Sequence, residues 1–247
     1  MATYDLRPLH VGEILDRTFG LYRAHFATLV GIAAVCQGPA AVMSLYVVFG
    51  GGLYQHPLIW VVAALVSFFG YLLAAGATLR VISEAYLGHE PELGSALGYA
   101  ARRMWPLFIA GATSGLAIGL ATLLLLVPGI IVACGYCVVS QVVVLEKPKR
   151  ANDALGRSWE LTKGSRDKAF AIGLVVYLVT NVPAIAIIWL ARSSPDLANV
   201  VGQLATLVLR PIMACAFTLF YYDLRVRKEA FDLELLGQHL GLEATPS

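Results

Sequence analysis

The sequence predicts an all-α integral membrane protein with six transmembrane helices. They form three hairpins, each preceded by an amphipathic helix in the cytoplasmic interface. Hydrophobic residues make up 58% of the 247 positions and charged residues only 14%, whereas a soluble domain carries about 25% charged residues. Long stretches lack any charged residue, and lysines and arginines gather in alternate connecting segments. The composition excludes a typical soluble enzyme and a disordered chain.

The first charge-free stretch predicts two membrane spans. It covers positions 24–79, which is 56 residues, and one crossing needs about 20 apolar residues. Glycines at 50–52 and Pro57 mark a turn inside it. We therefore expect spans at 27–49 and 58–79.

The later charge-free stretches predict four further spans. Pro128 and Gly129 are the strong turn signal inside the second stretch and separate its two helices. Arg210 interrupts the last helix. The four expected spans are 105–127, 129–145, 169–191 and 197–222.

The positively charged residues predict the orientation. The N-terminal segment, the connections after the second and fourth spans, and the tail carry 16 of the 18 lysines and arginines, while Arg192 alone is expected on the other side. Because positive residues stay in the cytoplasm, we expect both termini there, in a bacterial inner membrane. No apolar core precedes Ala27, so no cleavable signal peptide is expected. Residues 1–247 then form a single membrane domain with a cytoplasmic amphipathic tail at 223–247.

A polar segment with one apolar face precedes each predicted hairpin. The three segments cover residues 11–26, 93–104 and 152–164, with Asn152 as an expected N-cap and Gly164 as an expected C-cap. Helices of this kind lie among lipid head groups. They are either plain connectors or lipid- and partner-binding elements. The side chains expected to contact anionic lipid are Arg17, Arg23, Arg102 and Arg103.

Arg210 is the strongest anomaly, because a charge within a span is costly and usually faces the bundle interior or a water-filled cavity. Pro211 follows it and favours a helix kink. Depth along the spans, at about 1.5 Å per residue, indicates Glu146 as the preferred counter-ion, with Gln141 and Asn181 next. The alternative is structural: Arg210 extends toward the interface or locks the bundle.

Two further patterns have a structural and a functional interpretation. Cys134 and Cys137 match Cys-x-x-Cys, but both lie in an apolar helix without the context of a thioredoxin-like fold, which favours packing over redox chemistry. The smooth glycine stripe on the third span allows close helix packing within the chain or, alternatively, in a homodimer. That stripe consists of Gly111, Gly115 and Gly119.

The motifs of catalysis are missing from the sequence. Its five histidines lack metal-ligand spacing, and no nucleophile elbow, zinc-protease motif or phosphate-binding glycine loop occurs. We therefore expect no catalytic residue, metal or cofactor. A net charge of only +2 gives no reason to expect a nucleic-acid partner.

Three motif groups resemble the bacterial family known as the glycerophosphoryl diester phosphodiesterase membrane domain. They are Arg7-Pro8-Leu9 with Gly12-Glu13-Ile14-Leu15-Asp16, Arg157-Ser158-Trp159-Glu160-Leu161-Thr162-Lys163-Gly164, and Tyr221-Tyr222-Asp223-Leu224-Arg225. The resemblance covers nearly the whole chain and implies a six-span membrane module without an established activity. A diesterase barrel needs about 250 further residues, so no family catalytic residue carries over.

The leading hypothesis is a non-enzymatic membrane protein that binds lipids or a protein partner, in the cytoplasm or the membrane. The alternative is a small transporter or lipid-translocating protein that uses a polar site around Arg210. A membrane thiol oxidoreductase rests only on Cys134 and Cys137. A polar cavity reaching Arg210 favours transport, and a solid apolar core favours the binding module.

Overall fold

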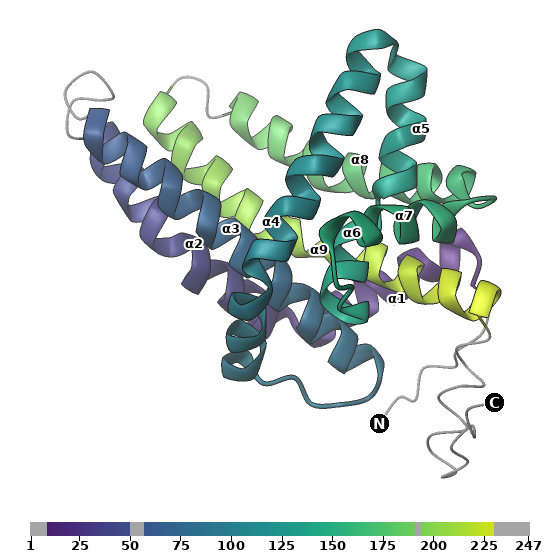
Figure 1. Cartoon of the computed structure of the whole chain (residues 1–247). Coiled ribbons are helices and arrows are strands. Elements are labelled where there is room, and N and C mark those ends of the chain that lie inside the picture. Colours follow the sequence, from purple (N-terminus) through teal and green to yellow (C-terminus); the bar gives the residue numbers. More distant parts are fainter. Residues whose placement is uncertain (1–8, 50–56, 191–193, 230–247) are drawn as a thin grey trace.

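A computed structural model describes residues 9–49, 57–190 and 194–229, and every regular element in these ranges is a helix. Figure 1 shows long helices that cross one another and shorter helices near one end. In chain order the elements are α1 (Val11–Ala24), α2 (Phe26–Phe49), α3 (Pro57–Tyr86), α4 (Leu93–Leu124), α5 (Leu126–Tyr136), α6 (Val139–Gln141), the π-helical turn η1 (Val142–Glu146), α7 (Ala151–Thr162), α8 (Arg166–Leu190) and α9 (Pro195–Glu229).

The described residues contain five segments that are long and apolar enough to cross a membrane, which fits a multi-pass membrane protein. They are Phe26–Met43, Val61–Tyr86, Leu93–Leu124, Leu126–Glu146 and Val200–Glu229. The expected span at 169–191 coincides with α8 but is not among these five. The sixth span and the three-hairpin arrangement therefore stay predictions.

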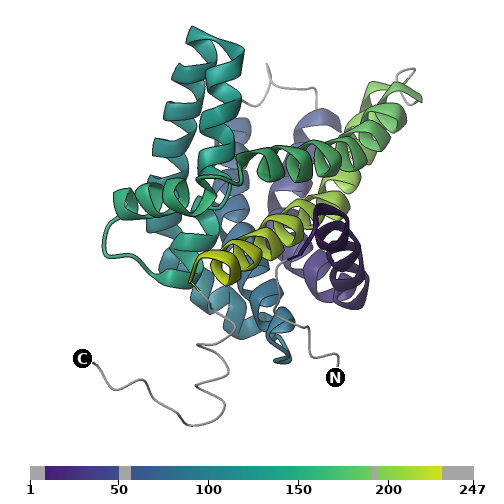
Figure 2. The same cartoon turned by 90° about the vertical axis from the view of Figure 1, so that its right-hand side faces the viewer.

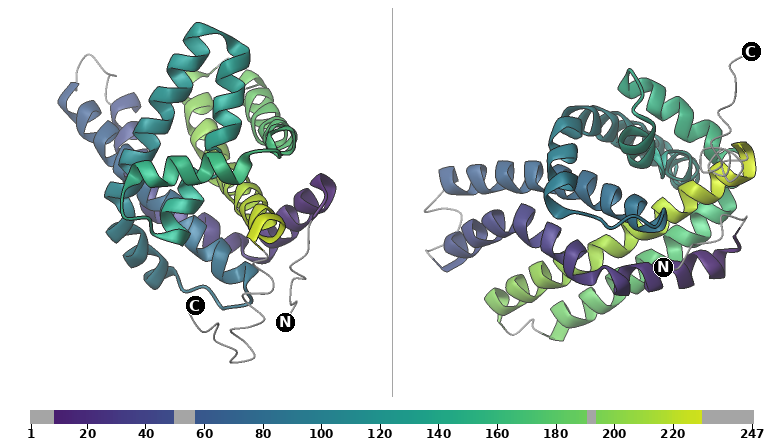
Figure 3. Two further views of the ribbon diagram at one scale, coloured as in Figure 1. Left: turned by 45° about the vertical axis from the view of Figure 1, so that its right-hand side comes forward. Right: turned by 90° about the horizontal axis from the view of Figure 1, so that it is seen from below.

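Consecutive long helices pack side by side: α2 on α3, α3 on α4, α4 on α5, and α8 on α9. Figure 2 shows the C-terminal ends of α2, α4 and α8 on one side of the bundle and the C-terminal end of α9 on the opposite side. Figure 3 shows α9 running through the bundle beside α1 and α8, and α9 also contacts α2 and α3. Among the described helices, α9 is thus the central packing element.

Three expected boundaries were wrong. The amphipathic segment at 93–104 is not a separate helix, because α4 continues through Pro106 to Leu124. The turn expected at Pro128-Gly129 lies at Leu125, whose extended backbone (φ −160°) separates α4 from α5. The tail expected from 223 begins inside α9, which continues to Glu229, while residues 230–247 lie outside the described residues.

The other two amphipathic segments are separate helices. In α1 the apolar face is buried and includes Ile14, Leu21 and Tyr22. The third segment is α7, whose N-cap is Arg150 and not Asn152; the side chain of Asp153 accepts a hydrogen bond from the Arg150 N–H, 3.2 Å away. Gly164 follows the helix with a positive φ of 83°, a conformation that suits glycine after a helix end.

A buried carboxylate joins the two ends of the described chain. Asp223, whose side chain is fully buried, accepts hydrogen bonds from the Leu9 N–H at 2.7 Å, Lys168 Nζ at 2.6 Å and Arg227 Nε at 3.1 Å. Lys168 Nζ and Arg227 also donate to the Leu9 carbonyl, at 2.5 and 2.7 Å. We call Leu9, Lys168, Asp223 and Arg227 the Asp223 cluster. It fixes the N-terminal segment against α8 and α9.

Candidate functional site

A cavity of about 370 Å³ lies where α2, α3, α6 and α9 meet. Small side chains leave this space between the helices, because alanines from three helices line it: Ala33, Ala74, Ala75 and Ala214. Leu79, Met213 and Phe217 form apolar walls. The volume falls within the usual range of small-molecule sites, about 300–1,000 Å³.

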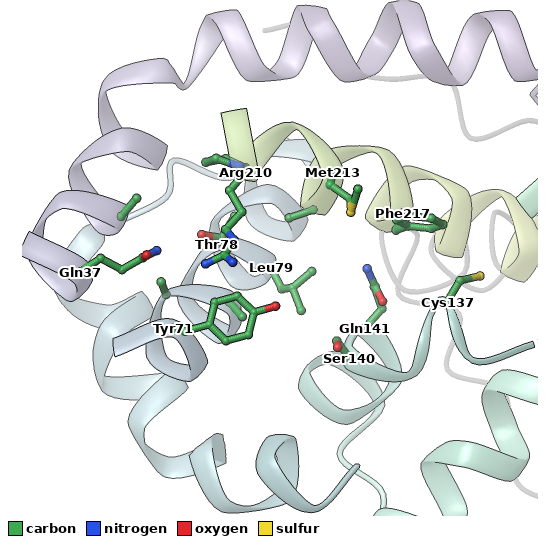
Figure 4. A pocket seen from close by; sticks show the side chains of 15 residues that line it. Gln37, Tyr71, Thr78, Leu79, Cys137, Ser140, Gln141, Arg210, Met213 and Phe217 are labelled. Atoms are coloured by element: carbon green, nitrogen blue, oxygen red, sulfur yellow. The ribbon is translucent and has the colours of Figure 1, made fainter. Parts of the chain in front are cut away.

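Polar side chains from four helices line the same cavity. Gln37 comes from α2, Tyr71 and Thr78 from α3, Gln141 from α6, and Arg210 from α9. Figure 4 shows them directed into a common space, with Arg210 close to Tyr71 and Thr78. A cavity with apolar walls and a few convergent polar groups is typical of a binding site.

Arg210 provides the formal positive charge of this cavity. Its guanidinium carbon lies 4.4 Å from the centre of the Tyr71 ring, a cation–π arrangement. The lining residues, all within the described ranges, contain no acidic side chain. Stacking uses the face of the guanidinium and leaves the N–H donors at its edge for a planar oxyanion.

Gln141 contributes an unusual acceptor to the cavity wall. The residue is 3% exposed, and its Oε1 is buried without a hydrogen-bond partner in the described structure. An unpaired buried amide oxygen costs about 1–3 kcal/mol, so native proteins seldom retain one without a reason. This oxygen has almost no accessible surface, so a ligand donor would reach it only after the Gln141 side chain turns toward the cavity.

The helices around the cavity are held at fixed points. Tyr22 of α1 donates a 2.6 Å hydrogen bond to the Val208 carbonyl, two residues before Arg210. Pro211 lies inside α9 and lines the cavity, and its missing N–H leaves one backbone carbonyl without its usual helical donor. The Arg210 segment is therefore braced from outside the cavity by α1.

Comparison with known proteins does not assign the chain: neither a protein-family model nor a curated protein nor a solved structure matches it. The site must be interpreted from its own geometry.

Glu146 is not the partner of Arg210. Instead it accepts hydrogen bonds from Arg157 Nε at 2.8 Å and from the Tyr221 hydroxyl at 2.9 Å. Arg157 also pairs with Glu229. Burial acts to lower the pKa of the Arg157 guanidinium, but the hydrogen bonds to both carboxylates raise it overall. Glu146 therefore joins α7 to α9 and has no part in the cavity.

Asn181 is also away from the cavity. Its side-chain amide donates to the Tyr177 carbonyl at 3.0 Å and to Thr180 Oγ1 at 3.1 Å, both on its own helix α8. Of the three expected partners of Arg210, only Gln141 shares its cavity. The partner that contacts Arg210, Tyr71, was not anticipated from the sequence.

The glycine stripe does not pack within the described chain. Gly111, Gly115 and Gly119 are exposed on α4, and an added Cβ at any of them would meet nothing within 4 Å. The interpretation as internal packing is therefore wrong, and a homodimer through this face stays a prediction.

The two cysteines of the Cys-x-x-Cys motif are free thiols near the end of α5. Cys137 lines the Arg210 cavity, next to the break between α5 and α6. Their geometry adds no observation that favours redox chemistry.

The four arginines expected at lipid head groups lie on α1 and α4. Arg23 and Arg102 are exposed, whereas Arg17 and Arg103 are partly buried. Positions on two helix surfaces fit a diffuse contact with anionic lipid.

Proposed function

We propose that this membrane protein is a small transporter or lipid-translocating protein whose substrate occupies the cavity around Arg210. The observation that carries the proposal is a partly open cavity that holds the Arg210 cation and has no acidic side chain among its lining residues, all of which lie in the described ranges. A charged side chain inside a membrane protein marks a substrate or ion pathway by default. The proposal involves binding and movement, without a chemical conversion.

The charge of the cavity indicates an anionic substrate. Arg210 is exposed on the open side of the bundle, and its guanidinium can donate charged hydrogen bonds to a carboxylate or phosphate group that enters the cavity. Tyr71 covers one face of the guanidinium and so holds it in place before the anion arrives. Pre-organisation of this kind lowers the entropy cost of binding.

Gln141 and the walls narrow the substrate class further. If the Gln141 side chain turns toward the cavity, its Oε1, which has no partner in the described structure, can accept a hydrogen bond from a hydroxyl or an amine on the substrate. The apolar walls formed by Leu79, Met213 and Phe217 accommodate an apolar portion. The best fit is an anion that also carries a hydrogen-bond donor, either as a small hydroxylated anion or as the head group of a lipid.

A second candidate function is a lipid- or partner-binding module that moves nothing. Arg23 and Arg102 favour it, because both are exposed on polar helix segments. This candidate predicts no transport and no role for Arg210. The family resemblance, the inner-membrane location and the cytoplasmic termini are compatible with both functions and remain part of the proposal.

Arg210→Gln is expected to abolish most transport. Purified protein is placed in liposomes, and translocation of fluorescent phosphatidylglycerol is followed beside uptake of radiolabelled lactate and inorganic phosphate. Removing one charged hydrogen-bond donor costs about 1.5–3 kcal/mol, a factor of roughly 10–100 in binding. Arg210→Lys keeps the charge but loses the planar stacking on Tyr71, and we expect an intermediate rate.

Lys149→Gln is the control, because it removes one positive charge from an exposed position outside the cavity. It should transport like the unaltered protein. Equal rates for Arg210→Gln and the unaltered protein would contradict the assignment. Rates no higher than in empty liposomes for all three probes would favour the binding module.

Gln141→Leu is expected to raise stability and weaken substrate binding at once. The substitution keeps the volume and removes a buried oxygen without a partner, so the free energy of unfolding should rise by about 1–3 kcal/mol. Thermal unfolding in nanodiscs and the liposome assay measure the two effects. A lower melting temperature would show that Gln141 has a structural partner, and unchanged transport would show that the substrate does not contact it.

A further inference from the structure

A second hollow, of about 410 Å³, lies between α3 and α4, apart from the Arg210 cavity. Residues from the last two turns of α3 and the first three turns of α4 line it: Arg80, Glu84, Gly94, Ser95, Gly98, Tyr99 and Arg102. We call it the Tyr99 hollow. Gly94 and Gly98 form a floor without side chains, and an added Cβ at either meets nothing within 4 Å.

Two cations lie against the Tyr99 ring, and a third lines the same hollow. The Arg80 guanidinium carbon lies 5.0 Å from the ring centre, and Lys147 Nζ lies 5.5 Å from it. Arg102 lines the hollow and is exposed. Glu84, paired with Arg80 at 2.6 Å, is the acid among the lining residues, so these four charged groups carry a net charge of +2.

The Tyr99 ring is held in position by its hydroxyl, which donates a 2.5 Å hydrogen bond to the Val144 carbonyl of η1. This bond joins α4 to the turn that presents Lys147, whose backbone has a positive φ of 55°. The backbone of α4 and η1 therefore sets the positions of Tyr99 and Lys147.

The position of the hollow along α4 indicates that its ligand is a lipid. Trp105 follows Arg102 by one turn and is 67% exposed, and exposed leucines at 116, 120 and 123 continue along α4. Exposed tryptophan is typical of the boundary between head groups and acyl chains. Along α4 the hollow precedes Trp105, on the side that carries Arg80, Glu84 and Arg102, so a lipid with its acyl chains beside Trp105 would have its phosphate at the hollow.

We propose that the Tyr99 hollow binds the phosphate of an anionic membrane lipid, with Arg102 and Arg80 as the phosphate contacts and Lys147 adding to the positive field. Two arginines and a lysine around one recess suit a phosphate oxyanion. The glycine floor lets the head group approach the α4 backbone closely. This site is separate from the Arg210 cavity, and its occupation does not depend on transport.

The test measures binding of dioctanoyl phosphatidylglycerol to the purified full-length protein by native mass spectrometry, with dioctanoyl phosphatidylcholine as the reference lipid. Arg102→Gln should weaken phosphatidylglycerol binding about tenfold, the loss of one charge-assisted contact. Gly98→Leu keeps every charge and fills the hollow, so it should weaken binding to a similar degree. Binding of phosphatidylcholine should be weak for all proteins.

Two controls match these variants. Lys149→Gln removes a positive charge from an exposed position outside the hollow, and Gly111→Leu adds the same side chain to an open position on α4; both should bind within about twofold of the unaltered protein. Leucine favours a helix over glycine, so unchanged or higher melting temperatures confirm that the leucine variants fold. Gly98→Leu with full phosphatidylglycerol binding would overturn the site. Displacement of the lipid by millimolar inorganic phosphate would overturn the assignment to a lipid.

Discussion

Replacing Asp223 with asparagine is expected to lower the free energy of unfolding by about 3–5 kcal/mol, the usual cost of removing one partner from a buried ion pair. Asparagine keeps the shape but removes the charge that compensates Lys168, whose side chain is 14% exposed. It also turns one carboxylate oxygen, an acceptor here, into a donor facing the Leu9 N–H or the two cations. Thermal or denaturant unfolding in nanodiscs measures the loss.

Asp167→Asn is the matched control, because Asp167 is exposed in the first turn of α8, one residue before Lys168. It should change the free energy of unfolding by less than about 1 kcal/mol. The double variant Asp223→Asn with Lys168→Met should recover part of the loss, since both charges go together. Strictly additive losses would contradict the cluster as a coupled unit.

Gly70→Ala is expected to disrupt the crossing of α2 and α3. An added Cβ at Gly70 would overlap the Cys36 carbonyl oxygen and lie 3.2 Å from its carbonyl carbon. Backbone atoms cannot rotate away as a flexible side chain would, so the two helices must move apart. Overpacking costs about 1–3 kcal/mol and occasionally more, and close helix approach through small residues is what stabilises packing in membranes.

The same substitution should also change the Arg210 cavity. Gly70 precedes Tyr71 and Cys36 precedes Gln37, and both Tyr71 and Gln37 line the cavity. Separation of the helices widens it and moves the stacking partner of Arg210. Gly111→Ala, at an open position, is the control. A Gly70→Ala protein with unchanged melting temperature and transport would show that the crossing has space to adjust.

The fold class followed from the sequence because charge-free stretches of sufficient length have few alternatives to membrane helices. Exact boundaries did not follow. Pro128 lies within the first turn of α5, where helix N–H groups lack an internal acceptor, so proline is tolerated there. Gly129 serves packing, since an added Cβ would lie 2.8 Å from Thr122 Cα. Proline and glycine occur both in turns and, as here, inside closely packed helices. Their presence alone therefore does not locate a turn.

The sequence indicated that Arg210 is unusual, but it did not show which residues contact Arg210. Arg210 stands out in an apolar stretch, and depth along the spans brought Gln141 to a similar level. Depth did not show that Glu146 pairs with Arg157, which lies 11 residues later in the chain, on α7. Tyr71 was missed because an aromatic residue in an apolar helix has no pattern that distinguishes a cation–π partner from ordinary packing. Asp223 was missed for a similar reason, since its partners Leu9 and Lys168 lie 214 and 55 residues away.

The Asp223 cluster has a consequence for the order of events during synthesis. Its acid lies in α9, the last helix of the described residues, whereas Leu9 and Lys168 leave the ribosome earlier. Until α9 emerges, the Lys168 ammonium and the Leu9 backbone lack this acid, and α1 lacks the helix that it packs against. The N-terminal segment is thus secured only after translation has passed position 223. Completion of α9, and not insertion of α2, therefore completes the packing of the described helices.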